Sequence, residues 1–405
     1  MFVVSHPTGN QNVRAIINEL EHQNRLLKFY TTIARFDNNL TGMFSKLPGL
    51  KDLEKRTYSE AVKPYTVQYP YYEVGRMLYK KFNKTSPLPQ KYSVDNIYHT
   101  LDMQVAEYIK NNPKGLEGVY AYEDGAAFQF EEATRLGIKK VYDLPIAYWA
   151  TGRALMMRQS EIYPQWAKTL GGGIKDSQEK LDRKVREMEL ADVVATPSRF
   201  VADSIPAEMN KKVIISPFGS PAPRTDIEQP TWEIVKNRPL KILFAGSMGQ
   251  RKGLADLFNA VKLLSSKEIE LVVVGSLQDD FQFYKNQMPN FTYLGTMPHK
   301  EVLKTMASCD VFCLPSIVEG RALVVQEAMS QGLPIIITPN TGCDDLVTEG
   351  ETGFCVPINN SDAIASHIDW FASDRERTFQ MKAAARSKAL GYSWQGYARG
   401  VINNL

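Results

Sequence analysis

Short apolar runs alternate with helix-patterned segments throughout the second half of the chain. The runs predict strands at residues 241–246, 270–275, 291–295, 309–314 and 334–338. The segments between them predict helices at 254–264, 299–307 and 322–331. Strands of four to six apolar residues in a β/α alternation indicate a parallel sheet that is covered on both faces. Because crossovers are right-handed, we expect a doubly wound α/β domain whose ligands bind beyond the carboxyl ends of its strands.

The first half of the chain repeats this pattern less clearly. Residues 1–5 predict a strand, and residues 10–27 predict a helix with one apolar face. Further strands are predicted at 118–122, 140–145, 193–197 and 212–216, with a long charged helix at 175–190. Residues 38–115 are polar, basic and rich in tyrosine, with few strand signals.

A proline-rich stretch separates the two halves. Its four prolines, at positions 221, 223, 230 and 239, predict a linker over residues 221–239. A chain of 405 residues is too long for one ordinary core. We therefore expect an N-terminal Rossmann-like domain over residues 1–220 and a C-terminal domain over residues 240–391.

Composition indicates a soluble globular protein, with 43% hydrophobic and 23% charged residues. No window approaches 18 uninterrupted apolar residues, and the first residues are too short and too weakly basic for a signal peptide. We therefore expect a cytoplasmic protein. The net charge of +3 is mild and gives no reason to expect nucleic acid as a partner. The basic half of the chain, residues 1–220, leaves two alternatives open: peripheral contact with anionic lipid at the inner membrane face, or an ordinary cytosolic charge balance.

The cysteines and histidines show no pattern typical of a metal site. All four cysteines, Cys309, Cys313, Cys343 and Cys355, lie in the C-terminal half without metal-ligand spacing. Two of them lie in or beside an apolar strand, so we expect packed free thiols in a reducing compartment. The five histidines are scattered. We expect no metal site built by the protein.

Two carboxylates eight residues apart bracket a predicted strand-to-helix turn. Glu319 lies in the loop, and Glu327 lies more than two turns into the helix, about 12 Å along its axis at about 1.5 Å per residue. The backbone N–H groups at such a helix start form an anion site suited to a diphosphate. The alternative is that Glu319 is a helix-start acid favoured by the helix dipole and Glu327 belongs to a solvated face.

Four segments together resemble a known family. Residues 309–329 resemble the Glu-x7-Glu signature of retaining, nucleotide-sugar-dependent glycosyltransferases, and residues 246–253 match the Gly-Arg-x4-Lys-Gly phosphate loop of family 4 of these enzymes. Residues 350–354 match a loop typical of that family, and residues 392–398 look like its last helix. The resemblance implies the GT-B fold, with two Rossmann-like domains facing a cleft and the helix at 392–405 packing back on the first domain.

The resemblance also implies roles for residues at matching positions. Lys252 and Arg251 would hold the charge that develops on the diphosphate, and Glu319 would bind hydroxyls of the donor sugar. Glu327 would bind the ribose hydroxyls. The full set of expected donor contacts is Gly9, Asn10, Gly246, Ser247, Gly275, Gly295, Thr296, Gly320, Arg321, Ala322, Leu323, Val324 and Glu327. The co-substrate would be a nucleoside-diphosphate sugar, foremost a UDP-sugar, with no cofactor.

The chain departs from the family pattern at several positions. Ser247 stands where an arginine is usual, and the loop of residues 6–12 lacks the usual double glycine, although Gly9 and Asn10 still permit close backbone approach. Tyr122 stands where many members carry a histidine near the reacting sugar. Arg321-Ala322 replaces a frequent Phe-Gly, a change that would alter the sugar pocket.

Several residues of the first half are candidates for contact with the acceptor or the sugar. His6 follows the first strand, and is either a cleft residue or a structural one. Glu123 and Asp124 are either bases of an inverting reaction or a plain loop pair. Tyrosines and tryptophans at 58–72 and 149–166 either stack on an acceptor sugar or belong to the core.

The function that these features favour is retaining transfer of a sugar to an acceptor hydroxyl. The acceptor would be a glycan, a lipid-linked sugar or a small molecule, and residues 38–115 with Lys80, Lys81 and Lys84 would form part of its site. Two alternatives stay open: an epimerase or phosphorylase of the same fold, and a non-catalytic subunit that only binds. A phosphorylase would carry a pyridoxal phosphate lysine motif that is absent here, and a binding subunit would be expected to lose Glu319 or Lys252.

Overall fold

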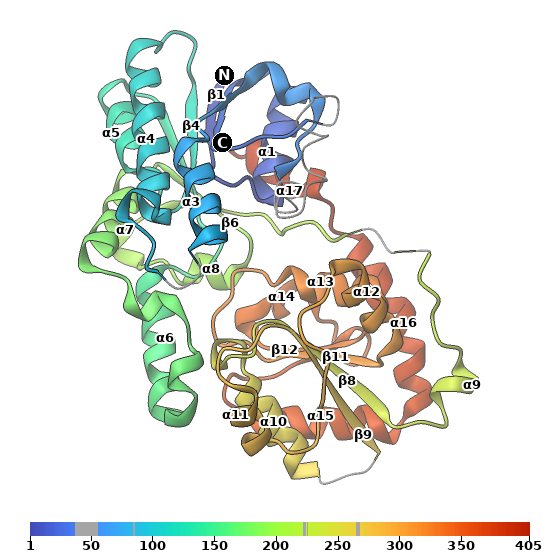
Figure 1. The fold of residues 1–405 in the computed structure, drawn as a ribbon. Coiled ribbons are helices and arrows are strands. Elements are labelled where there is room, and N and C mark those ends of the chain that lie inside the picture. Colours follow the sequence, from blue (N-terminus) through green and yellow to red (C-terminus); the bar gives the residue numbers. More distant parts are fainter. Residues whose placement is uncertain (37–55, 84–85, 222–223, 225, 265–267) are drawn as a thin grey trace.

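The computed structural model describes residues 1–36, 56–83, 86–221, 224, 226–264 and 268–405. Two α/β bodies lie one above the other, and the chain passes from the upper to the lower one near residue 220 (Figure 1). Each body has a parallel sheet with helices on its faces, as the alternation of apolar strands and amphipathic helices predicts.

The first sheet has seven strands in the order β3-β2-β1-β4-β5-β6-β7. Its strands are β1 Phe2–Ser5, β2 Leu26–Thr31, β3 Thr66–Gln68, β4 Gly118–Tyr122, β5 Lys139–Asp143, β6 Val193–Thr196 and β7 Lys212–Ile215. The helices of this half are α1 Gln11–His22, α3 Tyr71–Phe82, α4 Val94–Asn111, α5 Ala127–Arg135, α6 Trp149–Ile162, α7 Gln178–Leu190 and α8 Arg199–Asp203.

The second sheet has six strands in the order β10-β9-β8-β11-β12-β13. Its strands are β8 Leu240–Ala245, β9 Ile269–Val274, β10 Thr292–Tyr293, β11 Val311–Leu314, β12 Ile335–Ile337 and β13 Gly353–Cys355. The helices that follow β7 are α9 Trp232–Val235, α10 Leu254–Leu264, α11 Phe281–Gln287, α12 His299–Ser308, α13 Leu323–Ser330, α14 Cys343–Leu346, α15 Ser361–Ser373, α16 Arg375–Leu390 and α17 Trp394–Ile402.

The expected helix over residues 10–27 is wrong at its end. Helix α1 stops at His22, and residues 26–31 form the buried strand β2, which pairs with β1. Asn24 adopts φ 53°, a left-handed conformation that an α-helix cannot continue through. Residues 38–115, which carried few strand signals, hold β3, α3 and α4; residues 37–55 and 84–85 of that stretch lie outside the described part of the chain.

Helices α6 and α17 each tie the two halves together. Helix α6 extends from the first half along the side of the second (Figure 1), where the Gln159 amide exchanges hydrogen bonds with Gln250 and Asn359 at 2.8–3.0 Å. Trp166, just after α6, is buried among aromatic rings of the second half. At the other end, α17 returns to α1, where Arg399 Nε lies 3.2 Å from Glu19 Oε1. The domain limits expected from the sequence stay predictions.

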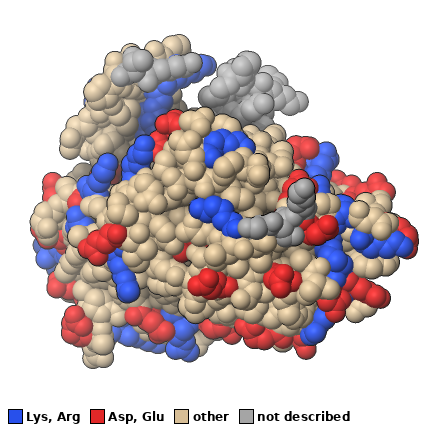
Figure 2. Space-filling view, turned by 90° about the horizontal axis from the view of Figure 1, so that it is seen from below, with Lys and Arg blue, Asp and Glu red and all other residues tan. Residues whose placement is uncertain are grey.

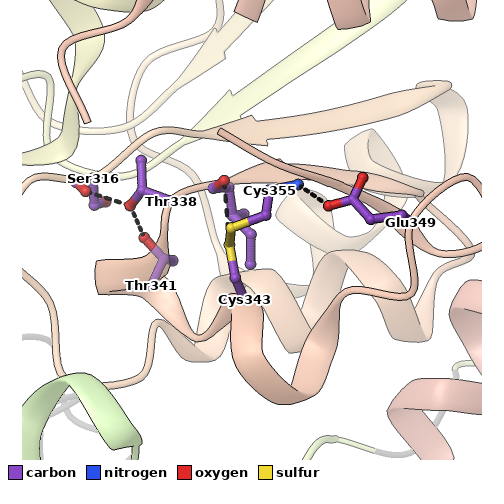
Figure 3. Close-up of a disulfide and its surroundings, with 7 residues drawn as sticks. Ser316, Thr338, Thr341, Cys343, Glu349 and Cys355 are labelled. Carbon is purple, nitrogen blue, oxygen red and sulfur yellow. Dashed lines mark hydrogen bonds between the residues drawn. A yellow bond between two sulfur atoms is a disulfide. The ribbon is translucent and has the colours of Figure 1, made fainter. Parts of the chain in front are cut away.

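The cysteines differ from expectation. Cys343 and Cys355 form a disulfide (Figure 3), so the expectation of four free thiols is wrong for this pair. The cause is topological: β12 pairs with β13 at Ile337 and Cys355, and the chain leaving β12 turns back so that α14 begins at Cys343 beside Cys355. Cys309 and Cys313 are free and buried, as expected, and burial raises the pKa of Cys309 to about 12.

Of the helices that the structure describes, none combines the length and apolar character needed to cross a bilayer. In the same part of the chain, His, Cys, Asp and Glu side chains do not gather in a group of three or more that could hold a metal ion. On the face of the molecule seen in Figure 2, lysines and arginines are interspersed with acidic side chains.

The disulfide predicts a thiol count. Alkylation of the denatured, unreduced protein should label two cysteines, Cys309 and Cys313, whereas prior reduction should raise the number to four. Mass spectrometry of the labelled peptides measures both. Cys343→Ser should give three labelled thiols without reductant, because Cys355 loses its partner. Four labelled thiols in the unreduced wild type would contradict the pairing.

Candidate active site

A cavity of about 610 Å³ opens at the carboxyl ends of β8 and β9 and at the start of α13. This is the edge of a doubly wound sheet where ligands bind. Most of the expected donor contacts line it: Gly246, Ser247, Arg251, Lys252, Gly275, Thr296, Glu319, Arg321, Ala322, Leu323, Val324 and Glu327. Segments that are 81 residues apart, from Gly246 to Glu327, therefore meet around one space.

Glu319 lies between the two expected cations at the floor of this cavity. Arg251 Nη1 donates to Glu319 Oε1 at 3.1 Å and to the carbonyl oxygen of Val318 at 2.9 Å, and Lys252 Nζ forms an ion pair with the same carboxylate oxygen. Burial lowers the pKa of Lys252, and the charge of Arg251 lowers it further, while Glu319 opposes both effects. Two cations share one anion, so the site is suited to accept more negative charge.

Close backbone contacts hold this arrangement in place. Gly253 has φ 72°, and a Cβ there would lie 2.0 Å from the carbonyl oxygen of Pro315, at the end of β11. A Cβ at Gly320 would lie 1.6 Å from the carbonyl oxygen of Pro145, in the first half of the molecule. Ser198 Oγ also donates to the carbonyl oxygen of Gly320 at 2.6 Å. The carboxyl edge of the first sheet therefore touches the loop that carries Glu319.

Glu327 has a partner that the sequence did not indicate. Glu327 Oε1 lies 3.0 Å from Nε2 of His299, at the start of α12, and both residues line the cavity. Met297 and Val302, from the same segment after β10, also line it. The sequence signal that could have indicated His299 is its position after a predicted strand. That signal is weak, because β10 is only two residues long.

Arg321 is directed toward other protein groups. Its guanidinium binds both oxygens of Asp345 at 2.7–2.8 Å and Gln326 Oε1 at 3.0 Å, and stacks over the Tyr392 ring at 4.7 Å. Gly295 does not line the donor cavity; its carbonyl oxygen accepts from the N–H of Gly275 at 2.9 Å.

Gly9 and Asn10, expected as donor contacts, line a different cavity of about 360 Å³ at the start of α1. His6, just before them, is fully buried, and its Nδ1 accepts from the N–H groups of Gly9 at 2.7 Å and Thr8 at 3.1 Å. Burial, helped by the charges of Arg56 and Arg14, lowers the pKa of His6 to about 3. The neutral ring thus carries its proton on Nε2 and shapes the turn before α1.

Tyr122 is the last residue of β4, and Glu123 and Asp124 follow it on the same edge of the first sheet. The Tyr122 ring packs edge-on against His6 with centroids 4.4 Å apart. Glu123 is buried and pairs with Lys184 Nζ at 2.7 Å; burial raises its pKa, and Lys184 opposes this. Asp124 lies 3.4 Å from the same lysine. Both acids therefore form ion pairs with Lys184, whereas the acids of a solvated loop would face water.

A third cavity, of about 230 Å³, connects the two halves. Glu123 and Lys184 from the first half line it together with Arg251 and Val318 from the second. Arg251 therefore borders both this space and the donor cavity. Glu123, one of the candidate residues at the end of β4, therefore lies across this small cavity from Arg251, which also lines the donor cavity.

Residues 227–388 match the family model of group 1 glycosyltransferases. The sulfoquinovosyl transferase SQD2 of Arabidopsis thaliana is 30% identical over 169 residues, 41% of this chain and 33% of that protein. A GDP-mannose-dependent alpha-mannosyltransferase of Mycobacterium tuberculosis is 28% identical over 214 residues, 52% of this chain and 54% of that protein. The chain therefore spans about a third to a half of the length of these relatives.

Solved structures match the whole chain. Anabaena HepE in complex with UDP superposes with a TM-score of 0.61 at 14% identity, covering 100% of this chain and 98% of that one. Sucrose-phosphate synthase from Thermosynechococcus elongatus gives 0.62 at 15% identity, covering 100% and 97%. The expected fold class, two parallel α/β sheets in the GT-B arrangement, is confirmed. Over residues 227–388 the chain is similar to the group 1 glycosyltransferases, as the sequence motifs predict.

His6 predicts a specific acid sensitivity. Its folded-state pKa of about 3 lies below its ordinary value of 6.5, so its contribution to stability is complete above pH 6.5 and is lost as pH falls toward 3. By linkage the loss amounts to roughly 3 kcal/mol between pH 7 and pH 4, at about 1.36 kcal/mol per unit. His6→Asn keeps an acceptor near the position of Nδ1 but does not titrate. Urea unfolding should therefore show a shallower acid loss in the variant.

The matched control for this measurement is His22→Asn, which changes an exposed histidine at the end of α1. It should follow the wild-type pH dependence. An identical acid slope in wild type and His6→Asn would show that His6 is not held neutral in the folded protein.

Proposed function

We propose that the protein is a retaining glycosyltransferase that moves a sugar from a nucleoside-diphosphate sugar to an acceptor hydroxyl. The observation that carries the proposal is the convergence of Arg251, Lys252 and Glu319 in a cavity at the carboxyl ends of β8 and β9. The backbone at the start of α13 lines the same cavity and adds the positive end of a helix dipole. Cations beside a helix start suit a diphosphate.

The chemical step breaks the bond between the anomeric carbon and the diphosphate oxygen. A bond to the acceptor oxygen forms on the same face of the sugar, and the proton of the acceptor hydroxyl passes to the departing diphosphate. Negative charge therefore grows on the diphosphate in the transition state, where Lys252 and Arg251 lie, and preorganised cations stabilise such charge. Glu319 pairs with both cations before donor arrives; once the diphosphate takes its place, its carboxylate is released to bind sugar hydroxyls.

The nucleoside would occupy the far side of the cavity. Glu327, held by His299 at 3.0 Å, presents a carboxylate that can accept hydrogen bonds from the two ribose hydroxyls. Thr296 and Gly275 line the wall near it and offer main-chain groups to the base. We keep a UDP-sugar as the first donor to test and GDP-mannose as the second. HepE has a structure in complex with UDP-glucose, and the mannosyltransferase of Mycobacterium tuberculosis is named for GDP-mannose. Transfer of a hexose is the form of the reaction we propose.

The acceptor would approach from the first sheet. Tyr122 and His6 lie together at the end of β4 and after β1, and Glu123 borders the cavity shared with Arg251. The ion pair of Glu123 with Lys184 makes an inverting reaction with Glu123 as base the less favoured alternative, because the lysine already occupies an oxygen of that carboxylate. Proton NMR of the product's anomeric centre distinguishes retention from inversion.

The test of the proposal is nucleotide release from a panel of UDP-, GDP- and ADP-sugars, measured with and without acceptor extracts. Release from one donor, together with a retained anomeric configuration, would support a glycosyltransferase. Interconversion of donor sugars without transfer would identify an epimerase instead. Binding without turnover of any donor would identify a binding subunit.

We propose a cytoplasmic location, with contact at the inner membrane face.

The role of Lys252 predicts a kinetic signature. Lys252→Ala should lower kcat by about 100- to 1,000-fold, equal to roughly 2.7–4 kcal/mol, with a smaller change in donor Kd. The reason is that its charge matters most when the diphosphate leaves. Steady-state kinetics and calorimetric titration with donor measure the two quantities.

The matched control is Lys304→Ala, which removes a lysine whose side chain is 50% exposed and pairs with Glu301 on the surface. It should leave kcat within twofold of wild type, as expected for a weak surface ion pair. A Lys252→Ala enzyme with near-wild-type kcat would contradict the role assigned to this lysine.

A further inference from the structure

Two unlike cavities lie on either side of α3 in the first half of the molecule. One, of about 360 Å³, is bounded by the loop before α1 and by Arg14, Arg56 and Arg76. The other, of about 750 Å³, is lined mainly by aromatic and aliphatic side chains, including Tyr69 and Tyr92. Helix α3 contributes Arg76 to the first cavity and Leu78 to the second. A ligand that crosses α3 would meet charge at one end and apolar surface at the other.

The first cavity has the chemistry of an anion site. Buried Arg56 and part-buried Arg76 share one buried carboxylate, Glu73, and Arg14 also borders the space. Among the described residues that line this cavity, three are arginines and one, Glu73, is an acid. Arginine is the side chain best matched to phosphate oxygens. Helix α1 begins at this cavity with no acidic residue in its first turn and no side-chain cap, so its dipole adds to the positive potential.

This cavity lies on the edge of the sheet that faces the proposed donor. Gly9 follows the carboxyl end of β1. On the same edge, Pro145 after β5 and Ser198 after β6 touch Gly320, next to Glu319. An anion held at the start of α1 would therefore sit on the acceptor side of the proposed transfer site.

The outer face of α3 is apolar where a surface helix is usually polar. Tyr71 is 73% exposed, Val74 41%, Leu78 48% and Phe82 74%. These positions are three, four and four residues apart, which places them on one stripe of the helix. Lys80 and Lys81 lie in its last turn, and both are exposed. Lys84, the third lysine expected to act here, lies outside the described residues. An exposed apolar stripe bordered by cations is typical of a helix that lies in a membrane interface.

We propose that the acceptor is a lipid phosphate or diphosphate held at an anionic membrane surface, which deepens the proposed glycosyltransferase function and depends on it. The phosphate binds Arg14, Arg56 and Arg76 at the start of α1. The lipid chain leaves over α3 along the aromatic cavity, whose wall includes Tyr71, Val74 and Leu78 of the stripe. The exposed stripe, which ends at Phe82, lies in the membrane interface. A soluble sugar phosphate would use the arginines but would leave the apolar stripe and the second cavity without an occupant.

The first test compares two probes, farnesyl phosphate and glucose 1-phosphate, by calorimetric titration of the full-length protein. Farnesyl phosphate should bind at least ~10-fold more tightly, since burial of even two or three methylene groups is worth about that factor. Arg14→Gln with Arg76→Gln should weaken both probes. The pair of variants leaves the buried contact between Arg56 and Glu73 in place. Equal affinities would identify a soluble phosphorylated acceptor and overturn the lipid assignment, and absence of binding by both probes would overturn the anion site.

The second test is sedimentation with vesicles of phosphatidylglycerol and phosphatidylcholine, compared with vesicles of phosphatidylcholine alone. The wild type should bind the anionic vesicles, less so at high salt, and the double variant Leu78→Ser, Phe82→Ser should bind at least ~10-fold more weakly. The matched control is Leu263→Ser, Leu390→Ser, two leucines that are 58% and 61% exposed in the second half. It should behave as the wild type. All four side chains are exposed, so the variants should fold.

Each outcome can be separated from failure of the proposed function. Donor release by the wild type is measured first, with water as acceptor. If the wild type releases donor nucleotide but does not bind vesicles, the lipid acceptor is overturned and the glycosyltransferase function stands. The same holds if the Leu78→Ser, Phe82→Ser variant and the Leu263→Ser, Leu390→Ser control lose vesicle binding equally. Absence of release from every donor, together with normal binding of farnesyl phosphate, would overturn the transferase function and keep the lipid phosphate site.

Discussion

The structure of the site depends on one carboxylate that holds two cations together. Arg251 and Lys252 carry like charges side by side in a part-buried space, an arrangement that is unfavourable unless an anion joins them. Glu319 is that anion. A diphosphate offers the same cations more charge and more oxygens. In the proposed function, donor binding at this site would be an exchange of one anion for another, and the exchange would free Glu319 to contact the sugar.

That exchange requires the Glu319 loop to stay in place when its ion pairs change. The backbone supplies the support. Gly253 lets the phosphate loop approach the end of β11, and Gly320 lets the Glu319 loop lie on Pro145 of the first half, where Ser198 also binds it. A side chain at either glycine would collide with a carbonyl oxygen. The position of the Glu319 carboxylate and the contact between the two halves are thus set by the same few atoms.

Local patterns were enough to predict the second sheet and most of its cavity, because the residues that line the cavity either directly follow an apolar strand or lie on a helix that follows one. What depended on distant contacts was missed. Strand β2 was taken for the end of a helix, since only pairing with β1 distinguishes residues 26–31 from a helical face. His299 was missed because its partner is Glu327, 28 residues later. The disulfide of Cys343 depends on the pairing of β12 with β13.

The proposed donor and acceptor sites differ in the same way: the first follows from a local sequence pattern, and the second from contacts between distant residues. Arg251 and Lys252, the cations proposed to hold the diphosphate, are adjacent in sequence, so a motif can reveal them. The arginines of the first half come from three segments, at positions 14, 56 and 76, and meet only around the cavity that the start of α1 and helix α3 both line. On the proposed function, a short motif carries donor recognition, whereas acceptor recognition is assembled by the tertiary fold. Changes in the segments that carry α3 would then alter the acceptor without disturbing the residues proposed to hold the diphosphate.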